Sequence, residues 1–133
     1  MGKDCQGFTL TELLIAVAII AVLAGIAYPG YTHYLKKAYR AEIVALLGEQ
    51  AHSLERFYTR NGTFIDANGV SAGNDRYRIS TTLNPQDFTL LASAAIGSVM
   101  AGDACGEFSL TSTGVRSNPG AAPEMSRKAC WGQ

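Results

Sequence analysis

The sequence lacks an excess of charge of either sign. Eleven lysine and arginine residues balance eleven aspartate and glutamate residues in the 133-residue chain, and they form no long block of one sign. Proteins that bind nucleic acid or anionic lipid through a broad electrostatic field carry such a block. Composition therefore offers no argument for nucleic acid as a partner, and the length favours a single domain.

Motifs that carry catalysis are also missing. The sequence has no glycine-rich phosphate loop and no nucleophile elbow. Its two histidines, His33 and His52, do not have the spacing of metal ligands. Residues 66–69 hint at a calcium loop, but Gly69 and Tyr77 occupy positions at which an EF-hand needs other residue types. We therefore expect no enzyme activity, no cofactor and no bound metal.

Charged side chains are absent over one long stretch. From Leu13 to Leu35 there is no Asp, Glu, Lys or Arg. At about 1.5 Å per residue, a helix of this length can cross roughly 30 Å of hydrocarbon. Glu12 stands at the start of the stretch, where a lone charge costs at least ~2.5 kcal/mol. We interpret residues 8–34 as a membrane helix and Glu12 as a functional residue.

Beyond Pro29 the apolar residues recur at steps of three and four. This period is typical of an amphipathic helix with one buried stripe. The stripe consists of Leu35, Tyr39, Ile43, Leu46, Leu47, Leu54, Phe57 and Tyr58. Because Asn61-Gly62 is a helix-stop signal, one long helix is predicted from Phe8 to about Arg60.

The remaining sequence predicts a small sheet. Alternating apolar and polar residues occur in segments 76–81, 88–92 and 108–111, with turn residues between them. These segments predict three or four antiparallel strands, and the helix stripe would supply the other half of their core. The expected fold class is α+β, with a long N-terminal helix packed on the sheet and residues 35–133 forming a globular head.

Three sequence features together resemble type IVa pilins over nearly the whole chain. They are the start Gly7-Phe8-Thr9-Leu10-Thr11-Glu12, the break Tyr28-Pro29-Gly30-Tyr31, and the C-terminal pattern Cys105-Gly106-Glu107-Phe108-Ser109-Leu110-Thr111, then Gly114, then Cys130-Trp131. The C-terminal pattern most resembles the PilE-like minor pilins. Two departures occur: Asp4 and Cys5 make the leader less basic than usual, and Thr11 stands where a larger apolar residue is common.

The resemblance assigns roles to the N-terminal residues. Residues 1–7 would be a leader peptide, which prepilin peptidase removes by cutting between Gly7 and Phe8 before methylating the new amine of Phe8. In a filament, Glu12 would pair with the amine of a neighbouring subunit. Breaking that pair in a dry bundle would cost ~3–5 kcal/mol. The alternative is that Glu12 merely caps an ordinary signal anchor.

Pro29 is assigned to assembly as well. A proline inside a helix removes a backbone donor, so a kink or local melting is expected around Gly25, Pro29 and Gly30. In lipid this segment must stay helical, because lipid cannot satisfy a bare backbone. We therefore expect it to lose helical hydrogen bonds only when the subunit leaves the membrane.

The three cysteines fit the same resemblance. If Cys5 leaves with the leader, an even pair remains. Pairing Cys105 with Cys130 would close a loop of about 26 residues, which a chain-entropy treatment makes worth roughly 3.5 kcal/mol. Such a bond implies an oxidising compartment. The alternative is two free buried thiols in a cytosolic protein.

The predicted orientation rests on the resemblance and the disulfide, against the charge pattern. Lys36, Lys37 and Arg40 follow the apolar run, whereas Lys3 alone precedes it in the leader. Counted by the positive-inside rule, these charges would put the C-terminal side in the cytosol. The resemblance and the disulfide put the head in the periplasm of a single-pass inner-membrane protein, and later on an extracellular pilus fibre.

The function that the resemblance implies is structural. The chain would be a minor pilin that supports pilus assembly, and hence twitching motility and adhesion. Its partners would be other pilin subunits, prepilin peptidase and the assembly machinery of the inner membrane. Alternatives are a major pilin, a type II secretion pseudopilin, against which the C-terminal cysteine pair speaks, and a receptor pilin for DNA uptake.

The DNA-receptor alternative has a small electrostatic basis. Arg116, Arg127 and Lys128 fall in the proposed disulfide loop, against Glu107 and Glu124. An excess of one positive charge is a weak basis for phosphate contacts. Nucleic acid is therefore not the expected partner.

Overall fold

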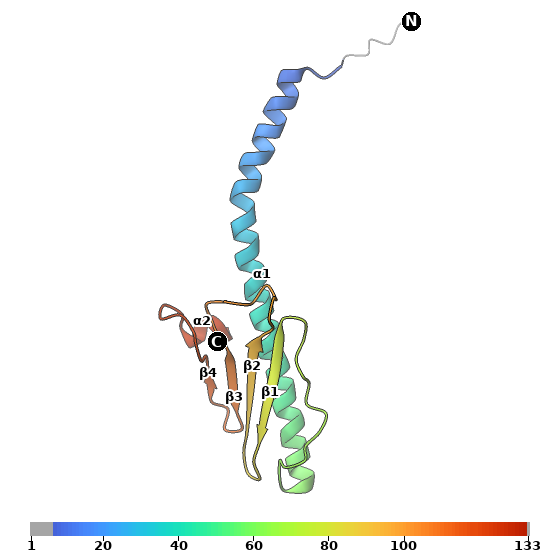
Figure 1. Cartoon of the computed structure of the whole chain (residues 1–133), viewed down its shortest axis with the longest axis vertical. Helices are drawn as coiled ribbons and strands as arrows, with labels where there is room; N and C mark the ends of the chain where they lie inside the picture. The colour runs from blue at the N-terminus through green and yellow to red at the C-terminus, as the bar shows by residue number, and fades with distance from the viewer. Residues whose placement is uncertain (1–6, 133) are drawn as a thin grey trace, which may run out of the picture. The chain divides into compact units, whose positions relative to one another are not determined.

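The computed structural model describes residues 7–132, so the leader prediction for residues 1–6, Cys5 included, lies outside the described residues. The chain forms two compact units, of which the first ends at Leu35 and the second begins at Lys36. Helix α1 (Leu10–Asn61) contributes to both and is 52 residues long (Figure 1). The predicted long helix is confirmed.

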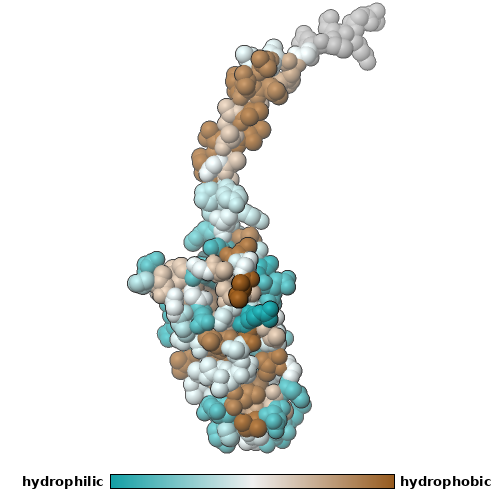
Figure 2. All heavy atoms as spheres, viewed as in Figure 1, coloured by the Kyte–Doolittle hydropathy of each residue, from teal (hydrophilic) through white to brown (hydrophobic). Residues whose placement is uncertain are grey.

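The first unit is an α-helical segment without a core of its own. Every side chain from Gly7 to Tyr31 is exposed, and apolar side chains cover its surface (Figure 2). This part of α1 is long and apolar enough to cross a membrane. The helix begins at Leu10 rather than at the expected Phe8, because Thr9 caps it.

The second unit contains one antiparallel sheet. Its strands are β1 (Tyr77–Leu83), β2 (Phe88–Ala94), β3 (Phe108–Thr111) and β4 (Arg116–Ser117), in the spatial order β1-β2-β3-β4. The strands therefore follow one another as a simple meander. The prediction of three or four antiparallel strands is confirmed.

The core lies between the sheet and the part of α1 that belongs to the second unit. On α1, Arg40, Ile43, Leu47, Gln50 and Leu54 are buried at helical spacing. The sheet and its loops contribute the other buried apolar side chains: Tyr77, Ile79, Phe88, Leu90, Ala92, Met100, Phe108 and Leu110, among others. The buried side of α1 is therefore the side that the predicted apolar stripe indicated.

A disulfide joins Cys105 to Cys130, with Cα atoms 5.7 Å apart. Both cysteines are buried, and the segment between them contains β3, β4 and a short helix, α2 (Arg127–Trp131). The sequence pattern predicted only a loop after β3 and missed the short helix α2. Trp131 packs edge-on against Phe108, with ring centroids 5.4 Å apart, and ties α2 to the sheet.

Candidate functional site

The start of α1 is a capping box built from Thr9 and Glu12. The backbone N–H of Glu12 donates to Thr9 Oγ1 at 3.2 Å. In return, the backbone N–H and hydroxyl of Thr9 donate to Glu12 Oε2 at 2.9 and 2.8 Å. Reciprocal bonds of this kind satisfy two of the helix's unpaired N-terminal donors. The carboxylate is thus partnered within a single chain.

The predicted cleavage site lies immediately before this cap. Gly7 is exposed, and a Cβ atom at its position would meet nothing within 4 Å. The side chain of Phe8 is 80% exposed. The structure therefore places Gly7, Phe8 and Glu12 within one accessible stretch of six residues.

Pro29 lies inside α1, and the helix continues through Gly25, Pro29 and Gly30 without interruption. The carbonyl of Pro29 accepts a hydrogen bond from the Thr32 hydroxyl at 2.9 Å. Continuous helix is what the prediction requires of a subunit in lipid. The melting expected on assembly concerns another state and stays a prediction.

A buried ion pair joins α1 to the loop between β2 and β3. Arg40 donates from Nε and Nη2 to the two carboxylate oxygens of Asp103, at 2.9 and 2.7 Å. Asp103 also accepts from the backbone N–H of Cys105 at 3.3 Å, next to the disulfide. Burial raises the pKa of Asp103, but the hydrogen bond and charge of Arg40 outweigh it and hold that pKa below its usual value.

Tyr77 packs beside this ion pair. Its side chain is fully buried, and its hydroxyl has no hydrogen-bond partner among the described residues. Burial, followed by the charge of Asp103, raises the pKa of Tyr77 to about 12. The hydroxyl is therefore un-ionised at physiological pH and is an unfavourable group in this core.

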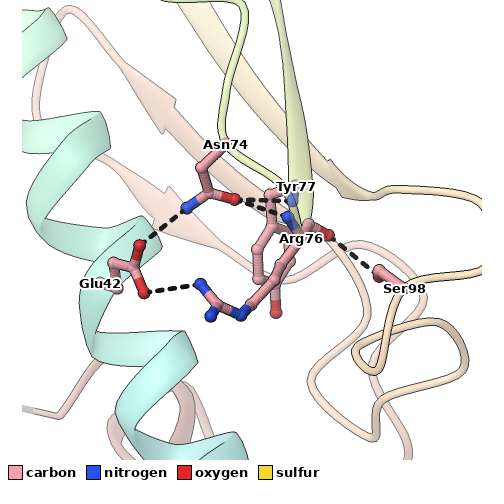
Figure 3. A network of polar contacts seen from close by, with 5 residues as sticks. All are labelled: Glu42, Asn74, Arg76, Tyr77 and Ser98. Carbon is pink, nitrogen blue, oxygen red and sulfur yellow. Dashed lines mark hydrogen bonds and ion pairs between the residues drawn. The ribbon is translucent and has the colours of Figure 1, made fainter.

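A second polar network fastens the start of β1 to α1 (Figure 3). Arg76 pairs with Glu42 at 3.2 Å, and its guanidinium lies 3.7 Å from the centroid of the Tyr39 ring. Asn74 donates to Glu42 at 3.3 Å and accepts from two backbone N–H groups at the start of the strand. Ser98, from the loop after β2, donates to the carbonyl of Arg76 at 3.1 Å.

Two matches to protein-family models show which family the chain belongs to. Residues 2–28 match the prokaryotic N-terminal methylation motif, and residues 29–109 match the family described as "Type IV minor pilin ComP, DNA uptake sequence receptor". The chain belongs to the type IV pilin family. Pilins are structural proteins, and nothing in the comparisons points to catalysis.

Individual relatives agree with this assignment. The pilin is 35% identical over 98 residues to the fimbrial protein EcpC of Eikenella corrodens, a match that covers 73% of the pilin and 60% of EcpC. It is 37% identical over 68 residues to the type IV major pilin PilE1 of Neisseria gonorrhoeae, covering 51% and 41% of the two chains. The pilin thus spans less than two thirds of the length of these curated relatives.

Two solved structures share the fold. A type IV pilin from Shewanella oneidensis superposes with a TM-score of 0.55 at 28% identity, covering 72% of this pilin and 97% of that chain. The non-core minor pilin PilV of Neisseria meningitidis gives a TM-score of 0.58 at 21% identity, covering 70% and 93%, which is a likeness of fold alone. The predicted α+β pilin fold is confirmed.

The basic residues singled out in the disulfide loop lie partly together. Arg116 and Arg127 line a hollow of about 410 Å³ with Trp131 and the turn at residues 113–115. The Arg116 guanidinium lies 5.4 Å from the centroid of the Trp131 ring. Glu107 does not line this hollow; it accepts a hydrogen bond from Ser93 at 2.5 Å.

The residues considered as metal ligands are separated. His33 lies in the first unit and His52 in the second, and no group of three His, Cys, Asp or Glu side chains within residues 7–132 could hold a metal ion. Asp66 adopts a left-handed backbone conformation, with φ 63°, in the turn that follows Phe64.

Proposed function

We propose that this pilin is a minor structural subunit of a type IV pilus. One observation carries the proposal: the methylation motif of residues 2–28 includes most of a helical segment without charged residues, and every residue from 7 to 31 is exposed among the described residues. Such a surface needs lipid or other subunits around it. Residues 8–34 anchor the subunit in the inner membrane before assembly and pack against other pilins in the fibre.

Processing exposes the assembly group. Prepilin peptidase removes residues 1–7 by cutting between Gly7 and Phe8, and the new amine of Phe8 is methylated. The open space around Gly7 supports this step, because a protease must approach the backbone closely. The head, residues 35–133, lies in the periplasm, where the disulfide Cys105–Cys130 can form.

Glu12 then supplies the contact that fixes the axial position of one subunit relative to the next. The backbone N–H and the hydroxyl of Thr9 both donate to Oε2, so Oε1 can accept from the Phe8 amine of a neighbouring subunit. The capping box holds the carboxylate in place before that amine arrives, so less side-chain freedom is lost on pairing. Pro29 serves assembly by letting the helix yield after extraction from lipid.

The test compares Glu12→Ala with Thr9→Ala. Glu12→Ala removes the carboxylate's part of the capping box together with the intermolecular pair, whereas Thr9→Ala removes the hydroxyl's part of the box and keeps the carboxylate. We expect both variants in the inner-membrane fraction, with Glu12→Ala missing from sheared pili and Thr9→Ala present. Quantitative mass spectrometry of sheared pili measures this, and normal incorporation of Glu12→Ala would refute the role of Glu12.

A receptor role in DNA uptake is the second candidate, and the description of the family that matches residues 29–109 favours it. The hollow brings the cationic side chains of Arg116 and Arg127 together beside the Trp131 ring. Salt-dependent binding of duplex DNA, weakened by Arg127→Gln and Lys128→Gln but not by Lys37→Gln, would support it. DNA binding that Arg127→Gln does not weaken would exclude the hollow as the site, because Arg127 lines it and Lys128 and Lys37 do not.

A further inference from the structure

The loop between β2 and β3 presents apolar side chains to solvent. Residues 94–102 contain no charged residue, and Ile96 and Val99 are 104% and 60% exposed. We call residues 95–102 the apolar loop. Ile96 and Val99 are close in the chain and together form an exposed apolar patch, the kind of surface that contacts proteins or membranes.

Hydrogen bonds and one buried side chain attach the apolar loop to the rest of the head. The carbonyl of Ala95 accepts from the backbone N–H of Ser98 at 3.0 Å, and the Ser98 hydroxyl donates to the carbonyl of Arg76 at 3.1 Å. Met100 is fully buried in the core. Ile96 and Val99 are therefore exposed on a loop that hydrogen bonds and a buried side chain attach to the head.

The apolar loop is tied to the beginning of the part of α1 that belongs to the second unit. Asp103, which directly follows the loop, pairs with Arg40 at 2.7 Å, and Arg76, which holds Ser98, stacks on Tyr39 at 3.7 Å. Figure 1 shows the segment after β2 beside this part of α1. Arg40 follows the last residue of the uncharged segment, Leu35, by five positions. At about 1.5 Å per residue, the chain covers less than 10 Å over that distance.

Charge near the same part of α1 matches a lipid surface. Lys36 and Lys37 follow directly on the uncharged segment, and Lys37 is exposed. Asp75 and Arg78 line the hollow beside Ile96 and add no net charge. Asp103 is paired with Arg40 and Glu42 with Arg76. Lys36 also interacts electrostatically with Asp103, so Arg40, Lys36 and Asp103 together carry one net positive charge. The exposed Lys37 adds a second, which favours anionic phospholipid headgroups.

We propose that the apolar loop, with Lys36 and Lys37, is a foot that rests on the anionic lipid surface while the subunit is stored in the membrane. Ile96 and Val99 enter the interfacial layer, and the lysines contact headgroup phosphates. The foot orients the head on the bilayer and must detach when the subunit is extracted. The inference rests on the proposed membrane storage.

The test places single tryptophan reporters in the full chain, reconstituted in vesicles of phosphatidylcholine with or without phosphatidylglycerol. Val99→Trp reports the foot. Val115→Trp is a matched control, because Val115 is 56% exposed and lies at the opposite end of β3. Leu23→Trp reports membrane insertion of α1. Emission of the unsubstituted chain, whose Trp131 is buried, is subtracted.

We expect brominated acyl chains to quench Leu23→Trp and Val99→Trp but not Val115→Trp. Quenching of Val99→Trp should need phosphatidylglycerol, and Lys36→Gln and Lys37→Gln should each lower the ratio of docked to free heads about fivefold. If Leu23→Trp is quenched but Val99→Trp and Val115→Trp are equally unquenched, the foot is overturned while the membrane anchor stands. Unquenched Leu23→Trp overturns the membrane function itself.

One further result would also overturn the foot. If Val99→Trp emission moves to shorter wavelength without lipid quenching, and the shift grows with protein density in the vesicle, the loop contacts a second subunit instead of lipid.

Discussion

Removing the Asp103 carboxylate is expected to destabilise the head strongly. The side chains of Arg40 and Asp103 are only 10% and 3% exposed. Asp103→Ala leaves the Arg40 guanidinium buried without its charge partner, and breaking a buried pair in this way costs about 3–5 kcal/mol. For a unit of about 100 residues, a loss of this size lowers the unfolding midpoint by at least roughly 12 °C.

The assay is thermal unfolding of the detergent-solubilised chain, followed by near-ultraviolet circular dichroism. Glu42→Ala is the matched control, because it removes an ion pair of similar kind whose side chains are 30% and 49% exposed. An exposed pair of this kind contributes about 1 kcal/mol at most. Midpoints of Asp103→Ala and Glu42→Ala that agree within a few degrees would refute the reasoning.

The same pair predicts the pH dependence of the wild-type head. The pKa of Asp103 is lower in the folded chain than in the unfolded chain, so its stabilising contribution is fully present above the ordinary carboxyl pKa of about 3.9. The contribution disappears as the pH falls through the lowered folded value. On acidification, the unfolding midpoint of Asp103→Ala should therefore fall by less than that of Glu42→Ala, which keeps the Asp103 carboxylate.

Three further predictions concern the head. Cys105→Ser with Cys130→Ser removes a crosslink across 25 positions and should cost roughly 3.5 kcal/mol, measured by urea unfolding with the reduced wild type as control. Gly73→Ala should destabilise more than Gly69→Ala: both glycines have positive φ, but a Cβ at Gly73 would lie 2.0 Å from the carbonyl oxygen of Tyr77, whereas one at Gly69 meets nothing within 4 Å. Tyr77→Phe removes a hydroxyl without a partner among residues 7–132, so its midpoint should equal or exceed that of the wild type, and a clear loss of stability would reveal a missed hydrogen bond.

The amphipathic half of α1 could be predicted because its signal is periodic and local. Ile43, Leu47 and Leu54 are buried as the three-and-four spacing indicates. Arg40 and Gln50 lie on the same buried stripe but could not be recognised, since their partners lie far along the chain: Asp103 for Arg40, and the backbone N–H of Ser71 for Gln50. Such long-range polar pairs leave no local pattern.

The capping box of α1 and the short helix α2 had only weak signals in the sequence. Thr9-Leu10-Thr11-Glu12 fits the pattern of a capping box, and helix capping by Glu12 was expected only as the alternative to an intermolecular pair. Ser126 and Gly132 are the N-cap and C-cap of α2, but five residues are too few to show a helical period. The roles of Gly7, Phe8 and Pro29 depend on other proteins and stay predictions.

The exposed surface of the first unit restricts how a subunit can travel. Eleven large apolar side chains between Phe8 and Ile26 are more than half exposed. Placing them in water instead of an apolar medium would cost on the order of 20 kcal/mol. Under the proposed function, that cost opposes a route through the aqueous periplasm and favours direct passage of the helix from lipid to fibre. Because acyl chains are as apolar as leucine, the hydrophobic effect favours neither destination. Under the proposed function, the difference between membrane and fibre comes from close packing, from the pairing of Glu12, and from the work done by the assembly machinery.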